Sequence, residues 1–177
     1  MLVARRSHAL VWLNNQVYMF GGYEYSCEVH SLDENRWSNL DPTPINPGAT
    51  VATLYKKEIW VTGHETLTIS AFDPIPQRHR IINVELPSNN DRIMLVYGSN
   101  LYVITADENI IKFNGDETHI QTLDTGDVPM FWWVASTPNF DGASFYFVEC
   151  IGKLFEFNVK KEKLTEVRKL WESDRQN

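Results

Sequence analysis

Residues 5–40, RRSHALVWLNNQVYMFGGYEYSCEVHSLDENRWSNL, form the stretch from which the fold can be predicted. Residues 7–13 and 16–20 are rich in β-forming side chains, and the pair Asn14-Asn15 between them suits a two-residue hairpin turn. The second segment ends at Gly21-Gly22, and two further strands are expected at residues 27–32 and 36–40. The stretch therefore predicts four short consecutive strands.

The same pattern recurs three more times along the chain. The aromatic residue of the second strand falls at Tyr18, Trp60, Tyr102 and Tyr146, which lie 42, 42 and 44 residues apart. The hairpin turns keep this register at residues 14–15, 56–57, 98–99 and 141–142. The third strands end at residues 32–33, 72–73, 113–114 and 157–158. Three markers in a fixed order predict four units of four strands each.

The first unit resembles a kelch repeat, and Arg5, Gly21-Gly22, Leu32-Asp33 and Trp37 carry the resemblance. The resemblance implies an all-β fold, a β-propeller of four-stranded antiparallel blades, with four kelch-like blades in one domain spanning residues 1–177. The blades are expected at about residues 5–41, 48–86, 91–124 and 130–168, followed by a tail at residues 169–177.

The later blades carry the motif in a weaker form. Gly63-His64, Thr105-Ala106 and Glu149-Cys150 stand where blade one has its two glycines, and the fourth strand of blade two lacks a Trp. The expected strands are residues 49–55, 58–62, 68–73 and 80–85 in blade two, 92–97, 100–105, 109–113 and 118–123 in blade three, and 130–137, 143–148, 153–157 and 163–168 in blade four. The tail also has apolar residues at helical spacing, so a strand followed by a short helical end and a longer helix are both open.

The sequence also leaves open whether the four blades close into a ring. Blade one begins with its innermost strand and blade four ends with its outermost strand, so no blade combines strands from both termini. Four blades can close a small ring. In the other interpretation the chain is an arc of a larger propeller, and its terminal blades expose apolar faces that favour self-association, with Leu170 and Trp171 contributing.

Composition narrows the classes of partner. The net charge is −7, and basic residues are scattered, so nucleic acid is not an expected partner. No apolar run is long enough for a spanning helix, and no secretory signal is recognisable, so a membrane partner is not expected either. Cys27 and Cys150 are far apart, which fits reduced thiols in the cytoplasm or nucleus, although a single bridge between them stays open.

One end of the predicted propeller collects the candidate partner-binding residues. Successive strands alternate in direction, so the loops between second and third strands and the segments that join the blades open on the same end. Exposed aromatic and charged side chains on such loops are typical of binding hot spots. The candidates are Tyr23, Glu24, Tyr25, His64, Glu65, Asp107, Glu108, Trp132 and Trp133.

No catalytic or metal-binding residue is predicted. His64-Glu65 begins like a zinc-binding helix motif, but the second His is missing because residue 68 is Thr. His8 lies in a position where kelch repeats often have His, and packing explains it better than catalysis. No cofactor is expected. The resemblance implies a protein-binding module, such as an adaptor for the cytoskeleton or for substrate recognition by a ubiquitin ligase. The alternative is a propeller enzyme acting on a sugar or another small molecule in the central funnel.

Overall fold

The computed structural model describes residues 1–22, 25–45, 48–64, 66–84, 86, 92–105, 110–115, 117, 120–123, 136–138, 143–148 and 153–169. These residues form sixteen strands, and no helix occurs among them. The strands make four antiparallel sheets of four strands each, and within every sheet the strands follow one another in chain order. The predicted all-β class and the predicted grouping of strands are therefore confirmed.

The sheets are numbered here in chain order. Sheet one contains β1 (His8–Leu13), β2 (Gln16–Gly21), β3 (Cys27–Ser31) and β4 (Arg36–Leu40). Sheet two contains β5 (Thr50–Tyr55), β6 (Glu58–Gly63), β7 (Ile69–Asp73) and β8 (Arg78–Ile82). Sheet three contains β9 (Arg92–Tyr97), β10 (Asn100–Thr105), β11 (Ile110–Asn114) and β12 (Ile120–Leu123), and sheet four contains β13 (Ser136–Pro138), β14 (Ser144–Val148), β15 (Lys153–Asn158) and β16 (Lys163–Lys169).

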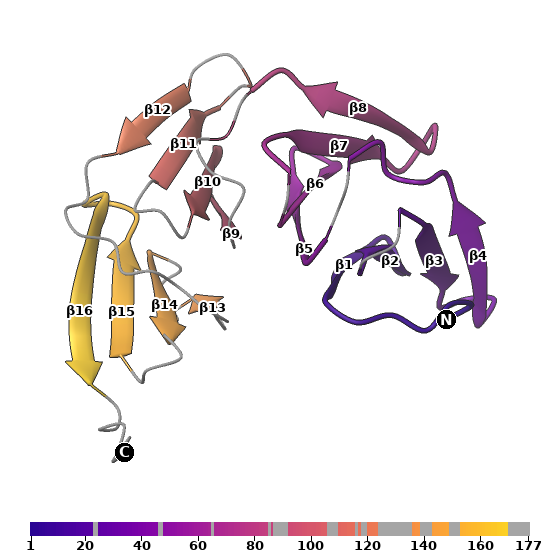
Figure 1. Ribbon diagram of the computed structural model, residues 1–177, viewed down its shortest axis with the longest axis horizontal. Coiled ribbons are helices and arrows are strands. Elements are labelled where there is room, and N and C mark those ends of the chain that lie inside the picture. The colour runs from indigo at the N-terminus through magenta and orange to yellow at the C-terminus, as the bar shows by residue number, and fades with distance from the viewer. Residues whose placement is uncertain are drawn as a thin grey trace.

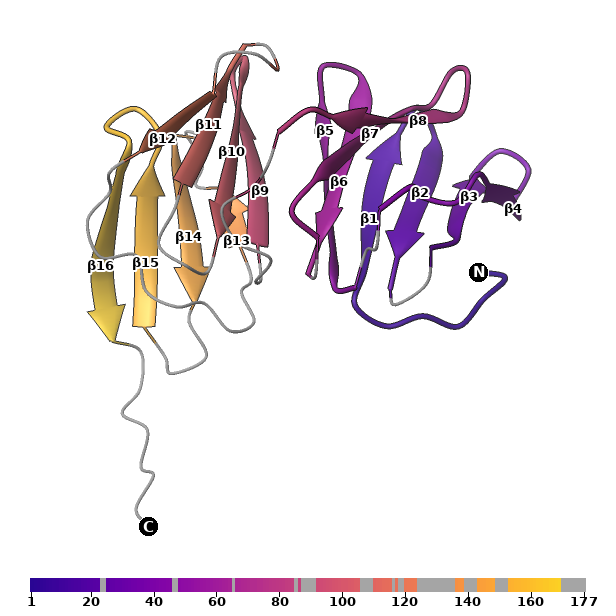
Figure 2. The ribbon, with the colours of Figure 1, turned by 45° about the horizontal axis from the view of Figure 1, so that its top comes forward.

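The four sheets stand side by side in a curved row (Figure 1). The first strand of each sheet lies on the inside of the curve and the fourth strand on the outside. Contacts join β1 to β5 and β5 to β9, so sheets one, two and three meet at their inner strands. Among the described residues no comparable contact joins sheet four to sheet one, and these two end sheets stand apart in both views (Figures 1 and 2).

The turn between the first two strands follows the sequence prediction. Asn14 and Asn15 have positive φ values of 50° and 60°, as a tight turn matched to the twist of the hairpin requires. Sheet two makes the same turn with Lys56 and Lys57, whose φ values are 50° and 73°. Asn adopts this backbone region more readily than Lys, so the turn of sheet one has the better-suited sequence.

The strand pairing corrects one marker of the predicted register. Val17 lies opposite His30 in sheet one, and Ile59 lies opposite Phe72 in sheet two. His30 therefore occupies the position of Phe72, and the prediction that Leu32-Asp33 does so is wrong. The prediction followed the aliphatic-Asp pair, but β3 ends at Ser31, and Leu32 lies in the turn with an exposed side chain.

Three other predicted strands, the fourth of sheet two and the first and fourth of sheet four, compare with the structure as follows. The fourth strand of sheet two was expected at residues 80–85 and runs from Arg78 to Ile82, because β7 already ends at Asp73 and a short turn follows it. The strand expected at residues 130–137 is described only as β13, since residues 130–135 lie outside the described part. β16 continues to Lys169, which confirms the strand expected in the tail. Residues 170–177 are not among those described.

Hydrophobic cores lie between successive sheets. Each sheet has a forward face, toward the next sheet in sequence, and a backward face, toward the preceding one. The forward face of sheet one presents Val11, Tyr18, Phe20, Cys27 and Val29, and it packs on Ile59, Val61 and Phe72 of sheet two. Similar buried clusters join sheet two to sheet three and sheet three to sheet four.

The repeated aromatic residues have one structural role at these junctions. Tyr18 packs against Phe72, Trp60 against Phe113 and Tyr102 against Phe157, with ring centroids 5.9, 5.4 and 5.4 Å apart. Each pair joins the second strand of one sheet to the third strand of the next. All three forward-facing members of these pairs are buried, as the sequence register predicts. Tyr146 holds the same position in sheet four and is only half-buried.

Polar contacts close the junctions at their edges. The Arg80 side chain bridges the carboxylates of Glu58 in its own sheet and Glu117 in sheet three. The Lys112 ammonium group pairs with Glu162 across the next junction. The Tyr55 hydroxyl donates a hydrogen bond to the Ser99 carbonyl at 2.8 Å. Because the Arg80 contacts are partly solvated, their energetic effect is small, and they serve mainly to fix the relative position of the sheets.

Candidate functional site

The loops between second and third strands meet the segments that cross from one sheet to the next. We call residues 41–49, which join β4 to β5, the first crossing segment. Its Thr43 N–H donates to the Tyr25 carbonyl at 2.9 Å, and the Ala49 carbonyl accepts the His64 N–H at the same distance. The Gly22 N–H donates to the Thr50 hydroxyl at 3.2 Å, just beyond the segment. The structure therefore brings the loops of sheets one and two and this crossing segment to one end, as predicted.

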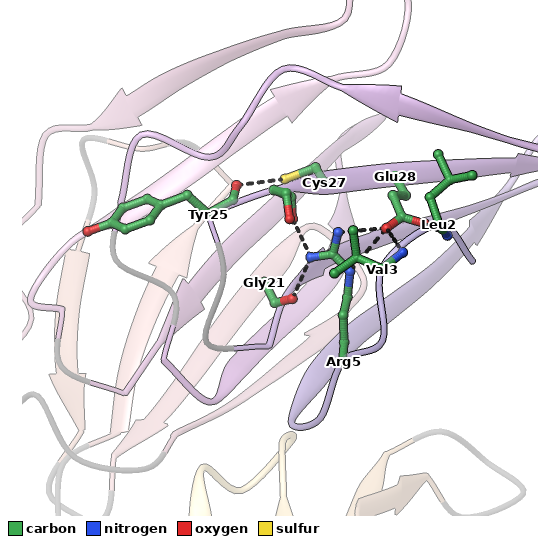
Figure 3. Close-up of polar contacts among 8 residues, drawn as sticks. Leu2, Val3, Arg5, Gly21, Tyr25, Cys27 and Glu28 are labelled. Atoms are coloured by element: carbon green, nitrogen blue, oxygen red, sulfur yellow. Dashed lines mark hydrogen bonds and ion pairs between the residues drawn. The ribbon is translucent and has the colours of Figure 1, made fainter.

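A buried arginine clamps the loop of sheet one (Figure 3). Nη1 of Arg5 donates to the carbonyls of Gly21 and Ser26 at 3.0 and 2.7 Å, which spans the two sides of the loop. Nη2 of Arg5 lies 2.7 Å from Oε1 of Glu28, and neither side chain is exposed to solvent. A charge at this depth needs such a complete set of partners, because an unpaired buried charge is strongly destabilising.

Glu28 also fixes the start of the chain. Its two carboxylate oxygens accept the backbone N–H groups of Leu2 at 2.7 Å and Val3 at 3.1 Å. Burial raises the pKa of the Glu28 carboxyl, but the hydrogen bonds from Arg5 and from the Leu2 backbone outweigh burial, so the net pKa lies below its usual value. Glu28 is therefore charged at neutral pH, and it holds residues 2–5 against sheet one.

A second buried arginine, Arg92, clamps the loop of sheet two. Arg92 follows its loop in the sequence, whereas Arg5 precedes the loop that it holds. Nη1 of Arg92, the first residue of β9, donates to the Gly63 carbonyl and the Thr62 hydroxyl, both at 2.9 Å. Nη2 donates to the Thr66 carbonyl. Gly21 and Gly63 are 42 residues apart, so the same carbonyl of the repeat accepts a guanidinium in both sheets.

Two glycines allow the loops and the chain segments beside them to approach closely. A Cβ atom on Gly22 would lie 2.6 Å from the Arg6 carbonyl oxygen, and a Cβ atom on Gly48 would lie 2.6 Å from the His64 carbonyl oxygen. Both glycines also have positive φ values, of 90° and 44°. Because these neighbours are backbone atoms that cannot move aside freely, neither site tolerates a larger residue without strain.

Two of the predicted binding residues are described by the structure. Tyr25 is 52% exposed, and its ring points away from the Arg5 clamp (Figure 3). His64 is half-buried beside Gly48 and Ala49. The other candidates, Tyr23, Glu24, Glu65, Asp107, Glu108, Trp132 and Trp133, lie outside the described residues.

The Cys27 thiol lies in the core and not at the surface. Cys27 is a free, fully buried thiol, and burial raises its pKa to about 11, so it is not nucleophilic at neutral pH. The described residues contain no group of three side chains that could hold a metal ion. No helix within the described ranges is long and apolar enough to cross a membrane.

Sequence reasoning missed both arginine clamps. Arg5 was used only as part of the kelch pattern, and Arg92 was taken as an ordinary strand residue. The partners of Arg92 lie 26 to 30 residues earlier in the chain, so no local pattern connects them. The sequence did offer one signal for the second clamp. Arg92 is the first residue of an inner strand, at the position that His8 and Thr50 hold in the first two sheets.

Comparison with known proteins shows similarity of fold alone. No protein-family model matches the sequence, and no curated protein matches it. One similar solved structure is a structural-genomics protein of unknown function from Bacteroides thetaiotaomicron VPI-5482, with a TM-score of 0.68 and 13% sequence identity. The match covers 89% of this chain and 42% of that protein, so the chain spans less than half the length of its structural neighbour.

Proposed function

We propose that this chain is a protein-binding module whose four sheets are consecutive blades of a kelch-like β-propeller. Three observations support this arrangement. The repeated aromatic residues Tyr18, Trp60 and Tyr102 are spaced 42 residues apart. The strands of each sheet follow one another from the inside to the outside of the curve, and the sheets stand in a curved row. The kelch resemblance rests on sheet one, and sheet two shares with it the guanidinium contact to the glycine carbonyl at the end of the second strand.

The exposed ring of Tyr25 carries the binding proposal. Its backbone is held by the hydrogen bond from Thr43, and the adjacent Ser26 carbonyl is held by Arg5. A large aromatic side chain on a fixed backbone loses little conformational entropy when it binds, which is why such residues form hot spots. The loop end is therefore the surface on which we place the partner, and Tyr25 is its described anchor.

A protein partner fits this surface better than a small molecule. The tyrosine side chain stands out from the loop, and the buried charges around it are fully engaged in the clamp. Kelch-type roles in substrate recognition by a ubiquitin ligase or in the cytoskeleton are both compatible with this proposal. Either role requires the partner to recognise the loop end and not the outer strands.

Affinity capture with three protein variants tests the proposal. The wild type, Tyr25→Ala and Ile75→Ala would be used as bait in parallel, and captured proteins would be quantified by mass spectrometry. Ile75 is 90% exposed and lies in the β7–β8 turn, at the opposite end of the sheets from Tyr25, so it is the matched control. We expect a protein retained by wild type and Ile75→Ala but reduced about tenfold by Tyr25→Ala, in line with a hot-spot residue.

Purified components would then confirm direct binding. The captured protein would be titrated against wild type and Tyr25→Ala by calorimetry, and the loss should appear again. Identical capture profiles for all three baits would contradict a binding role for the loop end.

A further inference from the structure

His79 lies in the junction between sheets one and two, close to the first crossing segment. Its ring packs on Phe72 of its own sheet and on Phe20 of sheet one, with centroids 4.8 and 6.1 Å apart. Both phenylalanine rings are fully buried. A side chain that can gain a proton near neutral pH is therefore held between two aromatic rings of a core.

The two ring nitrogens of His79 have unequal partners. Nδ1 lies 3.1 Å from the hydroxyl oxygen of Ser70, which is fully buried. Nε2 is also buried, and it has no hydrogen-bond partner among the described residues. A protonated ring carries an N–H group on both nitrogens, so Nε2 would then need an acceptor. The folded structure thus suits the neutral ring.

Asp41, the first residue of the first crossing segment, acts on the His79 ring from outside the core. Its backbone and its negative charge both raise the pKa of His79, but burial lowers that pKa more strongly. Since Nε2 has no acceptor in place, a protonated ring obtains one only if Asp41 moves toward it or if the ring leaves the core for water. In either case the contact between His79 and the start of the crossing segment changes.

The other titratable groups around this junction do not take the place of Asp41. Tyr18 and Cys27 face the junction from sheet one, and burial raises the pKa of both, so they are neutral at neutral pH. The two arginines beside His79 in β8 lie on the opposite face of the strand. His64 lies near the other end of the crossing segment, so it needs a control of its own.

The crossing segment connects Asp41 to Tyr25. Thr43 lies two residues after Asp41, its side chain is buried, and its N–H donates to the Tyr25 carbonyl at 2.9 Å. The Cys27 thiol also donates to this carbonyl, but at 3.7 Å and as a weak donor. The backbone position of Tyr25 therefore depends on the crossing segment.

Sheet one anchors the segment before it without a histidine. Glu28 lies opposite Met19 as Ser70 lies opposite Val61, so Glu28 holds the register position of Ser70. Its carboxylate accepts the N–H groups of residues 2 and 3, and its pKa lies below the usual value, so this anchor keeps its charge in mild acid. The corresponding contact of sheet two passes through His79 and is the one that a proton can change.

We propose that His79 is an acid-sensitive latch, which holds the first crossing segment and, through Thr43, the backbone of Tyr25. Below about pH 6 the charged ring no longer fits between Phe20 and Phe72, and the start of the segment moves. The hydrogen bond from Thr43 to Tyr25 then opens more often, so mild acid loosens the Tyr25 loop. Release of a bound partner in mild acid would follow, and this consequence alone rests on the proposed function.

Hydrogen exchange of single amides, followed by NMR on the full chain, tests the latch. The Thr43 N–H reports on the crossing segment. The Leu32 N–H, which donates to the Asn15 carbonyl at 3.1 Å at the opposite end of sheet one, is the internal control. After correction for the intrinsic effect of pH on exchange, the protection of Thr43 should fall at least ~5-fold between about pH 7 and about pH 5.5. The protection of Leu32 should stay constant.

Two variants separate the two histidines. His79→Phe keeps an aromatic ring but removes the proton, so the protection of Thr43 should no longer depend on pH. His64→Gln should keep the dependence of the wild type. A wild type without the fall, or an equal fall in His79→Phe, would overturn the latch. An equal fall at Leu32 would also overturn it, because that result indicates a general loosening of sheet one.

A measurement on the wild type covers the case in which a variant does not fold. The NMR signals of the His79 ring give its titration midpoint, and the protection of Thr43 should change with the same midpoint. Two different midpoints would contradict the latch.

Binding is measured separately, with the protein that wild type captures and Tyr25→Ala does not. Its affinity for the wild type should fall at least ~5-fold over the same pH range, and its affinity for His79→Phe should not. If no such protein is captured, the proposed function fails, whereas the exchange of Thr43 still decides whether the latch exists.

Discussion

Sheets one and two make the same close backbone contact, but the glycine that allows it lies on opposite sides of the contact in the two sheets. In both sheets the second-to-third-strand loop and the chain segment beside it approach so closely that one of them must be glycine. Sheet one places the glycine in the loop, as Gly22 beside Arg6, and sheet two places it in the crossing segment, as Gly48 beside His64. These pairs are 42 residues apart, so the contact is the same although the glycine has changed sides.

The third and fourth strands show a second exchange. His30 of β3 stacks on Trp37 of β4 in sheet one, and Phe72 of β7 stacks on His79 of β8 in sheet two, with ring centroids 4.9 and 4.8 Å apart. Each pair consists of one histidine and one aromatic residue at the same register position. The repeat is thus maintained in its contacts, and the residue at a single position is a poor guide to it.

The same comparison explains the burial of the two sheets. Sheet one carries the complete sequence motif, but within the described part of the chain a neighbouring sheet covers only one of its faces. Sheet two has lost a glycine and the tryptophan of its fourth strand, yet both of its faces are covered. Packing therefore depends on the neighbours of a sheet and not on the completeness of its motif.

The largest expected effect contrasts two tryptophans. Trp60 is 1% exposed between sheets two and three, so Trp60→Ala should lower the free energy of unfolding by about 3–5 kcal/mol. Trp12→Ala removes an exposed side chain and should change it by about 0.5 kcal/mol or less. Urea unfolding at a protein concentration that keeps the chain monomeric measures both values. Similar losses in the two variants would mean that Trp12 is covered within a single chain.

A smaller effect is expected for the exchanged glycine. Gly48→Ala combines a positive φ with a backbone clash and should cost about 1–3 kcal/mol. Gly98→Ala is the matched control, because Gly98 has a φ of 59° but no neighbour within 4 Å of an added Cβ. The control should lose only the strain of the left-handed conformation, about 1 kcal/mol.

A double variant makes the test of the exchange sharper. His64→Gly in the Gly48→Ala background places the glycine in the loop, as in sheet one. It should recover at least about 0.5 kcal/mol beyond the sum of the single changes, as expected for residues in contact. Strict additivity in thermal unfolding would show that the two glycine positions are unrelated.

The smallest effect concerns the exchanged histidine. Burial lowers the pKa of His79 below its usual 6.5, and the contact with Asp41 only partly offsets burial. The unfolded chain therefore binds a proton before the folded chain does, so stability should decrease as the pH falls through about 6.5. The melting temperature of the wild type should fall between pH 7 and pH 5, and His79→Phe should reduce that fall. An equal decrease in both proteins would exclude His79 as the cause.

Much of the fold was predictable because it depends on local and periodic signals. The turn at Asn14-Asn15, the aromatic ladder and most strand positions follow from residue type and spacing. The third strand of sheet one was misassigned because Leu32-Asp33 matched the expected residue types, whereas His30 is held in place by pairing with Val17 and stacking on Trp37. Such pairing between strands leaves no mark in the local sequence.

The candidate site was predictable only in outline. Strand alternation placed the loops and the first crossing segment at one end, and the hydrogen bonds of Tyr25 and His64 confirm it for sheets one and two. The clamps by Arg5 and Arg92 were not predicted, because each connects residues that are distant in sequence. The absence of a second glycine after Gly63 was taken as a weakening of the motif, and its compensation by Gly48 is visible only in three dimensions.

The two arginine clamps also set an order of assembly during synthesis. Arg5 precedes the loop that it holds, so the clamp on Gly21 and Ser26 can form as soon as sheet one has left the ribosome. Arg92 follows its loop, so the carbonyls of Gly63 and Thr66 must wait for the first strand of sheet three. Because chains fold progressively from the N-terminus as they are made, the clamp of sheet one can close before sheet two exists, whereas the clamp of sheet two closes only after the start of sheet three has been made. Amide exchange on ribosome-arrested chains would reveal this order as early protection of the Leu2 and Val3 N–H groups, which donate to Glu28, and late protection of the Thr68 N–H, which donates to the Thr66 hydroxyl.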